Sequence, residues 1–221
     1  YKKADKLSEE GVVDIQTASN PNAPHVLFVH LGDSNDISLD KFRKIAGNVV
    51  RKCKAFKRVQ WLSIDSVPDW DSHIAQVIEM VQYTVPNQKS KSNKVTFPIH
   101  SVITKHKVHV EDGVIIGQAV NKARTFANLP ANILTTTEFV DQIKSLFKSD
   151  KRYKLTILTE KELIAKKMHA LLGVGQGSKY PSFLVDITYT GNASNSKHVA
   201  LVGKGVVFDT GGISIKPSRN M

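Results

Sequence analysis

Short apolar runs alternate with segments of helical periodicity along this 221-residue chain, and this alternation limits its fold class more than any other feature. Runs of strand length occupy residues 25–31, 58–64, 153–158, 183–189 and 198–203, and residues 96–110 alternate enough for one or two further strands. Apolar residues recur at helical spacing in residues 38–53, 72–85, 113–128, 136–147 and 160–167, and Ser38 is the expected N-cap of the first of these helices. The pattern predicts an α/β fold with a mixed or parallel sheet and helices on its faces.

The same pattern suggests two domains. We expect an N-terminal α/β domain with a mixed sheet over residues 1–110 and a second α/β domain over residues 111–221. The helix expected near this boundary places several apolar side chains on one face, and it should end before Pro130 because the residue before a proline disfavours helix. These apolar side chains are Ile116, Ala119, Val120, Ala123 and Ala127.

The charge of the chain gives a second, weaker indication, which concerns its binding partners. The chain carries 31 Lys and Arg against 20 Asp and Glu, a formal net charge of +11. The basic residues gather in two clusters, Arg51, Lys52, Lys54, Lys57 and Arg58, then Lys89, Lys91 and Lys94. One interpretation is a phosphate-binding face for nucleic acid. The other is a solvated basic face and a polar loop, which the lack of a basic strand interleaved with aromatic residues favours.

Several classes of protein are excluded or disfavoured. No apolar run approaches the roughly 18 residues that span a bilayer, so we expect no association with membranes. The single cysteine, Cys53, excludes an internal disulfide and a multi-cysteine zinc site and is typical of a reducing, cytoplasmic compartment. The glycine-rich stretch at residues 173–177 lacks the spacing of a dinucleotide-binding loop.

The last 23 residues carry the clearest chemical signal. The apolar run at residues 198–203 would deliver Lys204, between two glycines, to the carboxyl end of a strand, where ligands of α/β sheets gather. Asp209 follows after apolar or small residues only. A buried lysine can bind a metal as a neutral amine and a carboxylate binds Zn²⁺, Mn²⁺ or Mg²⁺, but a buried ion pair fits the same spacing. Lys216 could polarise a carbonyl or lie at the surface.

Three segments together resemble the leucyl aminopeptidase family, the M17 dinuclear metallo-aminopeptidases. Residues 202–216, VGKGVVFDTGGISIK, match the family signature V-G-K-G-[hydrophobic]-x-F-D-[ST]-G-G-[hydrophobic]-S-[hydrophobic]-K without a gap. Residues 123–132 resemble the family's A-R-x-x-x-N-x-P-x-N element at the start of the catalytic domain. Residues 168–178, followed by Pro181, resemble its glycine-rich segment, although Lys167 stands where the family usually has glycine.

The resemblance implies a site and an activity. It makes Lys204 a metal ligand, Asp209 the carboxylate that bridges two divalent ions (Zn²⁺ or Mn²⁺, with Mg²⁺ as a further candidate), and Lys216 the catalytic lysine. It implies an α/β metallopeptidase that releases N-terminal, preferably leucine-like, residues from peptides as a homohexamer, with bicarbonate as a further cofactor. Residues 111–221 would then be the N-terminal part of the catalytic domain.

The family's remaining carboxylate ligands and its bicarbonate-binding arginine lie downstream of the lysine motif, in an N-T-D-A-E-G-R segment and at an earlier aspartate. This sequence shows neither, so we expect an N-terminal fragment with an incomplete metal site and no peptidase activity of its own. The alternative is a non-enzymatic binding protein that uses its basic N-terminal domain, with DNA as the candidate partner.

Overall fold

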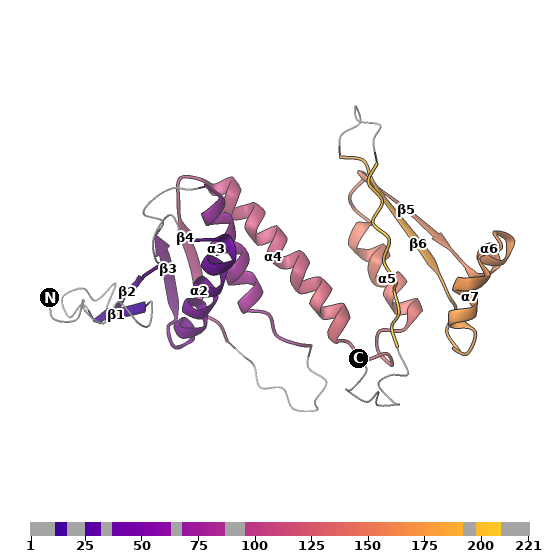
Figure 1. Cartoon of the computed structure of the whole chain (residues 1–221), viewed down its shortest axis with the longest axis horizontal. Coiled ribbons are helices and arrows are strands. Elements are labelled where there is room, and N and C mark those ends of the chain that lie inside the picture. The colour runs from indigo at the N-terminus through magenta and orange to yellow at the C-terminus, as the bar shows by residue number, and fades with distance from the viewer. Residues whose placement is uncertain are drawn as a thin grey trace. The chain divides into compact units, whose positions relative to one another are not determined.

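The computed structural model describes residues 12–16, 25–31, 37–62, 68–86, 96–191 and 198–208, with only the backbone of residues 12–16 and of Pro68. The chain divides into two compact units, Tyr1–Thr125 and Phe126–Met221, and Figure 1 labels the elements of both. The predicted domain boundary at residue 110 stays a prediction. The α/β class is confirmed, and both parallel and antiparallel strand pairs occur.

The first unit contains two strand pairs and three α-helices among its described residues. Strands β1 (Val12–Gln16) and β2 (His25–Val29) pair antiparallel, while β3 (Arg58–Leu62) and β4 (Ile99–Ile103) pair parallel. The helices are α2 (Leu39–Lys52), extended by the 3₁₀ turn Cys53–Ala55, then α3 (Pro68–Val81) and α4 (Lys107–Asn128). Each parallel strand is thus followed by a helix, as the alternating sequence predicts.

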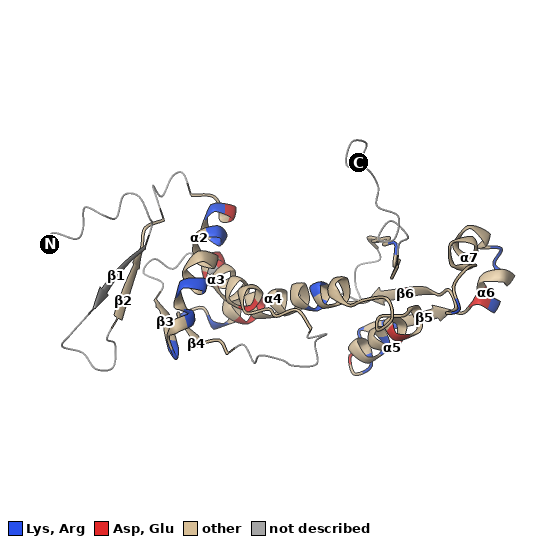
Figure 2. Ribbon diagram, turned by 90° about the horizontal axis from the view of Figure 1, so that it is seen from below, with Lys and Arg blue, Asp and Glu red and all other residues tan. Residues whose placement is uncertain are grey.

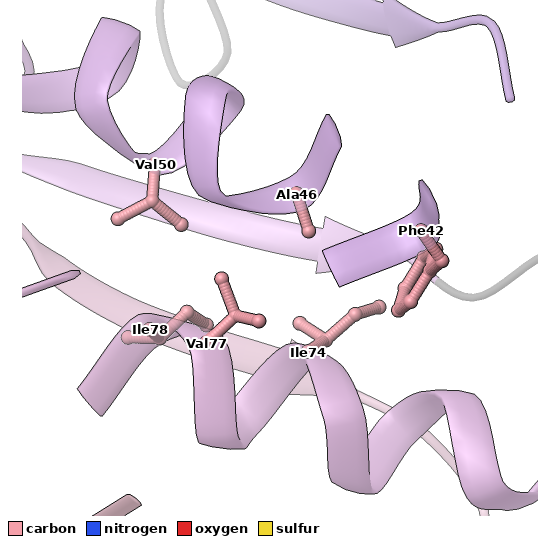
Figure 3. Packing of buried hydrophobic residues seen from close by; sticks show 6 residues of the cluster. All are labelled: Phe42, Ala46, Val50, Ile74, Val77 and Ile78. Atoms are coloured by element: carbon pink, nitrogen blue, oxygen red, sulfur yellow. The ribbon is translucent and has the colours of Figure 1, made fainter. Parts of the chain in front are cut away.

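The core of this unit lies between α2 and α3. Side chains spaced by three or four residues on each helix face one another, as Figure 3 shows for Phe42, Ala46 and Val50 against Ile74, Val77 and Ile78. Trp61 of β3 and Val102 of β4 pack against the same cluster, so the two helices cover one face of the parallel pair. The predicted N-cap is confirmed, because the Ser38 side chain accepts a hydrogen bond from the Lys41 N–H at 3.2 Å.

His100 of β4 is held as a neutral imidazole on the packed face of the parallel pair. Its Nδ1 accepts a hydrogen bond from the Trp61 indole N–H at 2.9 Å, and its buried Nε2 has no partner within the described residues. Burial lowers the pKa of His100 below its ordinary value of 6.5. Protonation at Nδ1 would remove the Trp61 hydrogen bond and place a charge in the core.

We therefore expect His100 to make the protein sensitive to acid. A group whose pKa is lower in the folded state stabilises that state above its unfolded pKa, and this contribution is lost as pH falls through the folded pKa. Urea unfolding at pH 7 and pH 5 should show a smaller loss of unfolding free energy for His100→Asn than for the unchanged protein. His169→Asn, at an exposed position of the second unit, should leave the loss unchanged. Equal losses in all three proteins would refute the role of His100.

Helix α4 packs through its glycines and not through the apolar face placed on it by the sequence. Gly113 and Gly117 are buried, whereas Ile116 is 46% exposed. Ala119, Ala123 and Ala127 are exposed as well. A methyl group added at Gly113 would lie 2.1 Å from the Ser72 carbonyl oxygen of α3, so only glycine permits this approach. The strand suggested over the last part of residues 96–110 is also wrong, because α4 already begins at Lys107.

The second unit alternates helices with one antiparallel strand pair. Helix α5 (Thr136–Phe147) and strand β5 (Tyr153–Leu158) have the predicted bounds. They are followed by α6 (Glu160–Ala165), α7 (His169–Gly175) and β6 (Leu184–Tyr189), which pairs with β5. The glycine-rich stretch expected as a loop is partly helical, since α7 extends through Gly175.

Lys167, between α6 and α7, has a left-handed backbone with φ of 56°. The Met168 N–H donates to the Leu163 carbonyl at 3.0 Å, and the Lys167 N–H donates to the Ile164 carbonyl at 2.9 Å. These two bonds define a Schellman motif, whose left-handed residue is usually glycine. This left-handed conformation explains why the family usually has glycine at this position. A lysine, which has a Cβ, adopts it only at a cost in folding free energy.

Lys167→Gly should therefore stabilise the second unit by about 1 kcal/mol, the cost of a left-handed conformation for a residue with a Cβ. Chemical denaturation followed by circular dichroism measures the change. The matched control is Lys166→Gly, because Lys166 has a φ of −86° and gains nothing from glycine. A destabilised Lys167→Gly variant would contradict the interpretation.

Candidate functional site

Of the three candidate site residues, the structure describes one. Lys204 lies in the irregular segment over residues 198–208 and is exposed, while Asp209 and Lys216 lie outside the described residues. The structure thus does not test whether the three side chains come together. Their roles as metal ligands and catalytic lysine stay predictions.

The predicted buried strand at residues 198–203 is wrong in this structure. Its backbone is irregular, and the Val199, Leu201 and Val202 side chains are 89%, 95% and 97% exposed. A strand buried on both faces needs hydrogen-bonded neighbours at its edges and elements over its faces. The described sheet of this unit consists of β5 and β6 alone, so the apolar run has no neighbour there.

The Gly-Lys-Gly turn approaches helix α5. A methyl group added at Gly205 would lie 3.8 Å from the ring of Phe139, which itself packs on Phe126 with ring centroids 4.9 Å apart. Residues 136–147 have helical spacing and Thr135 caps this helix, accepting a hydrogen bond from the Glu138 N–H at 3.2 Å. Helix α5 thus lies next to Gly205, the residue that follows Lys204.

The residue types fit a divalent ion, but their number falls short of a complete site. A neutral lysine amine and an aspartate carboxylate are both metal ligands, whereas a zinc site takes about four donors. The described residues include no group of three or more His, Cys, Asp and Glu side chains that could hold a metal. Within those residues Lys204 is exposed and forms no hydrogen bond or ion pair.

The first basic cluster is a solvated surface. All five of its side chains are exposed at the end of α2 and the start of β3, and Lys and Arg colour parts of these elements blue in Figure 2. Arg51 donates to the Asn48 side chain at 3.0 Å, and the Lys54 ammonium lies 5.6 Å from the centre of the Phe97 ring. The second cluster, residues 89–94, lies outside the described residues. Nucleic-acid binding stays a hypothesis.

Two family models match the chain in sequence order. The N-terminal domain of the cytosol aminopeptidase family matches residues 8–92, and the catalytic domain of the same family, Peptidase M17, matches residues 121–221. The catalytic match contains all three candidate residues and the whole signature at residues 202–216. No helix in the described parts of the chain has the length and apolar character needed to cross a membrane.

Relatives with curated names agree with this match. A probable cytosol aminopeptidase of Dinoroseobacter shibae is 40% identical over 161 residues, covering 69% of this chain and 32% of the relative. Another, from Exiguobacterium sibiricum, is 31% identical and covers 98% of this chain and 46% of the relative. The chain thus spans less than half the length of these relatives.

Solved structures share the fold. A mutant of tomato leucine aminopeptidase has a TM-score of 0.77 at 19% identity, over 95% of this chain and 45% of the other. The bottromycin maturation enzyme BotP, solved in complex with Mn, has a TM-score of 0.69 at 24% identity, over 80% of this chain and 39% of the other. At these identities the likeness concerns the fold alone.

Proposed function

The chain belongs to the cytosol aminopeptidase family, M17, and on this basis we propose that the whole protein is a metal-dependent aminopeptidase. It releases N-terminal residues, preferably leucine-like ones, from peptides. It acts in the cytoplasm as a homohexamer, with bicarbonate as a further cofactor.

One observation carries the proposal. The two domain models of a single family match in order, and the gap-free signature from Val202 to Lys216 lies inside the catalytic match. The signature contains each residue type that the chemistry requires from this part of the chain: an amine donor, a carboxylate donor and a second cation.

Each side chain has a defined task in the proposed reaction. Lys204 and Asp209 would hold the divalent ions, which when bound supply Lewis acidity and an activated water. Lys204 must be neutral to do so, and the residues that pack around residues 198–208 in the whole protein would exclude water from it. Lys216 would stabilise the negative charge that develops on the oxygen of the scissile carbonyl.

Removal of metal tests the proposal. The intact protein should hydrolyse leucyl-p-nitroanilide, and dialysis against a chelator should lower the rate by roughly 100-fold or more, since a metal supplies several kcal/mol of transition-state stabilisation. Added Mn²⁺ or Zn²⁺ should restore the rate. Comparison of the two restored rates shows which ion supports hydrolysis better. A rate that survives complete removal of metal, as measured by atomic absorption, would refute the metal dependence.

The alternative of a non-enzymatic binder rests on the exposed basic cluster at residues 51–58. It predicts that the protein shifts the electrophoretic mobility of duplex DNA and that this binding weakens steeply as the salt concentration rises. The salt dependence arises because each phosphate that the protein neutralises releases counterions. Hydrolysis without such a shift supports the aminopeptidase alone. A shift without hydrolysis supports the binder.

A further inference from the structure

Helix α4 contacts helix α3 from Gly113 to Arg124, and the contacts follow the same order on both helices. Gly113 approaches Ser72, and Gly117 approaches Gln76 and Glu79. Farther along, the Asn121 side chain donates to the Glu79 carbonyl at 2.8 Å. The two helices therefore run parallel, which places both C-terminal ends at the same end of the pair.

The start of α4 is tied to the start of α3 by a buried carboxylate. Asp71 is completely buried, and its Oδ2 accepts a hydrogen bond from the Thr104 hydroxyl. The same hydroxyl accepts from the His106 N–H at 3.0 Å, directly before α4 begins. One end of the α3–α4 contact is thus fixed by side chains of the first unit.

The other end is fixed by Asn121 and Arg124. The last carbonyls of a helix lack partners inside it, and in α3 the Ile78 carbonyl accepts from the Gln82 N–H. The next two carbonyls, of Glu79 and Met80, accept from the Asn121 and Arg124 side chains, each at 2.8 Å. The Arg124 guanidinium also brings positive charge to a helix C-terminus, where it is favourable.

The two side chains support each other. The Asn121 side-chain oxygen accepts a hydrogen bond from Arg124 at 3.3 Å while its amide nitrogen bonds the Glu79 carbonyl. The guanidinium carbon of Arg124 lies 5.8 Å from the centre of the Tyr83 ring, just beyond the end of α3. Both residues are partly buried, so water competes with these bonds only in part.

We propose that Asn121 and Arg124 form a clamp that makes α3 and α4 open and close as one cooperative unit. The family's catalytic-domain model begins at residue 121, yet its first polar side chains bond the first compact unit. Helix α4 continues through Asn128, and Phe126 near its end, where the second unit begins, packs on Phe139 of that same unit. The clamp therefore acts on the part of α4 that belongs to the first unit.

Hydrogen exchange of the intact protein, followed by mass spectrometry, tests the clamp. Arg124→Gln should speed exchange about tenfold both at the end of α3 (residues 78–84) and in the last turns of α4 (residues 117–128), since a lost hydrogen bond to a charged group opens the pair by about that factor. Asn121→Ala should act at the same two segments. Gln118→Ala, at an exposed position of the same helix, and Lys161→Gln, at an exposed position of α6, should leave both segments unchanged.

The pattern of exchange distinguishes the clamp from a simple cap. Faster exchange only at the end of α3, or an effect no larger than in the two control variants, would overturn the proposal. If Arg124→Gln does not fold, Arg124→Lys provides the same test, because lysine keeps the charge but lacks the planar, preorganised guanidinium that bonds Met80 and Asn121. It should give a smaller acceleration in both segments, and no acceleration in α4 would overturn the clamp.

Discussion

Replacing Lys216 with alanine in the intact protein is expected to lower kcat by about two to three orders of magnitude while its bound metal stays near normal. The reason lies in the proposed role of the ammonium group, which stabilises charge that develops only in the transition state. Removal of one preorganised donor of this kind costs roughly 100- to 1,000-fold in kcat. The measurement is steady-state hydrolysis of leucyl-p-nitroanilide together with metal analysis of the same preparation.

Two comparisons make this result interpretable. Lys161→Ala removes an exposed lysine of α6 that forms no hydrogen bond or ion pair within the described residues, so its kcat should equal that of the unchanged protein. Asp209→Asn should instead lower the bound metal, because it changes a proposed ligand. Normal turnover in Lys216→Ala, or loss of its metal together with its activity, would remove Lys216 from the catalytic role.

The 221-residue chain on its own is expected to show no aminopeptidase activity, even with Mn²⁺ or Zn²⁺ added in excess. Its signature supplies two proposed ligands, Lys204 and Asp209, where a zinc site takes about four donors. Lys204 is also exposed in this chain and forms no hydrogen bond or ion pair within the described residues. Assays of the chain and of the intact protein, at equal concentration and with circular dichroism to verify folding, measure the difference.

Chelator-sensitive hydrolysis by the purified chain would contradict this expectation. It would mean that residues 1–221 complete the metal site by themselves, with donors that the resemblance does not identify. A folded but inactive chain beside an active intact protein would support the proposal that the remaining ligands lie elsewhere.

Local patterns in the sequence predicted much of the fold. Helix α5 and strand β5 have the predicted bounds, and Ser38 caps α2 as expected, since each depends on neighbouring residues of the same segment. The resemblance also marked Lys167 as unusual, and its left-handed backbone gives the physical reason. The candidate site residues follow from a contiguous motif, so the sequence could identify them without any knowledge of their surroundings.

The tertiary structure decided what the periodicity could not. The sequence places the apolar side chains of α4 on one face, but the chain buries the glycine face because Gly113 and Gly117 let α3 come close, which leaves Ile116 and Ala119 exposed. Arg124 and Asn121 likewise gain their role only where the end of α3 presents unpaired carbonyls.

The sequence by itself determined the α/β class and the family, and it predicts the residues that would carry the chemistry, because short-range periodicity and a contiguous motif encode them. Whether an apolar run becomes a buried strand depends on neighbours that hydrogen-bond its edges and cover its faces. Residues 198–203 have the composition of such a strand, and only the tertiary structure shows that they lie exposed without those neighbours among the described residues.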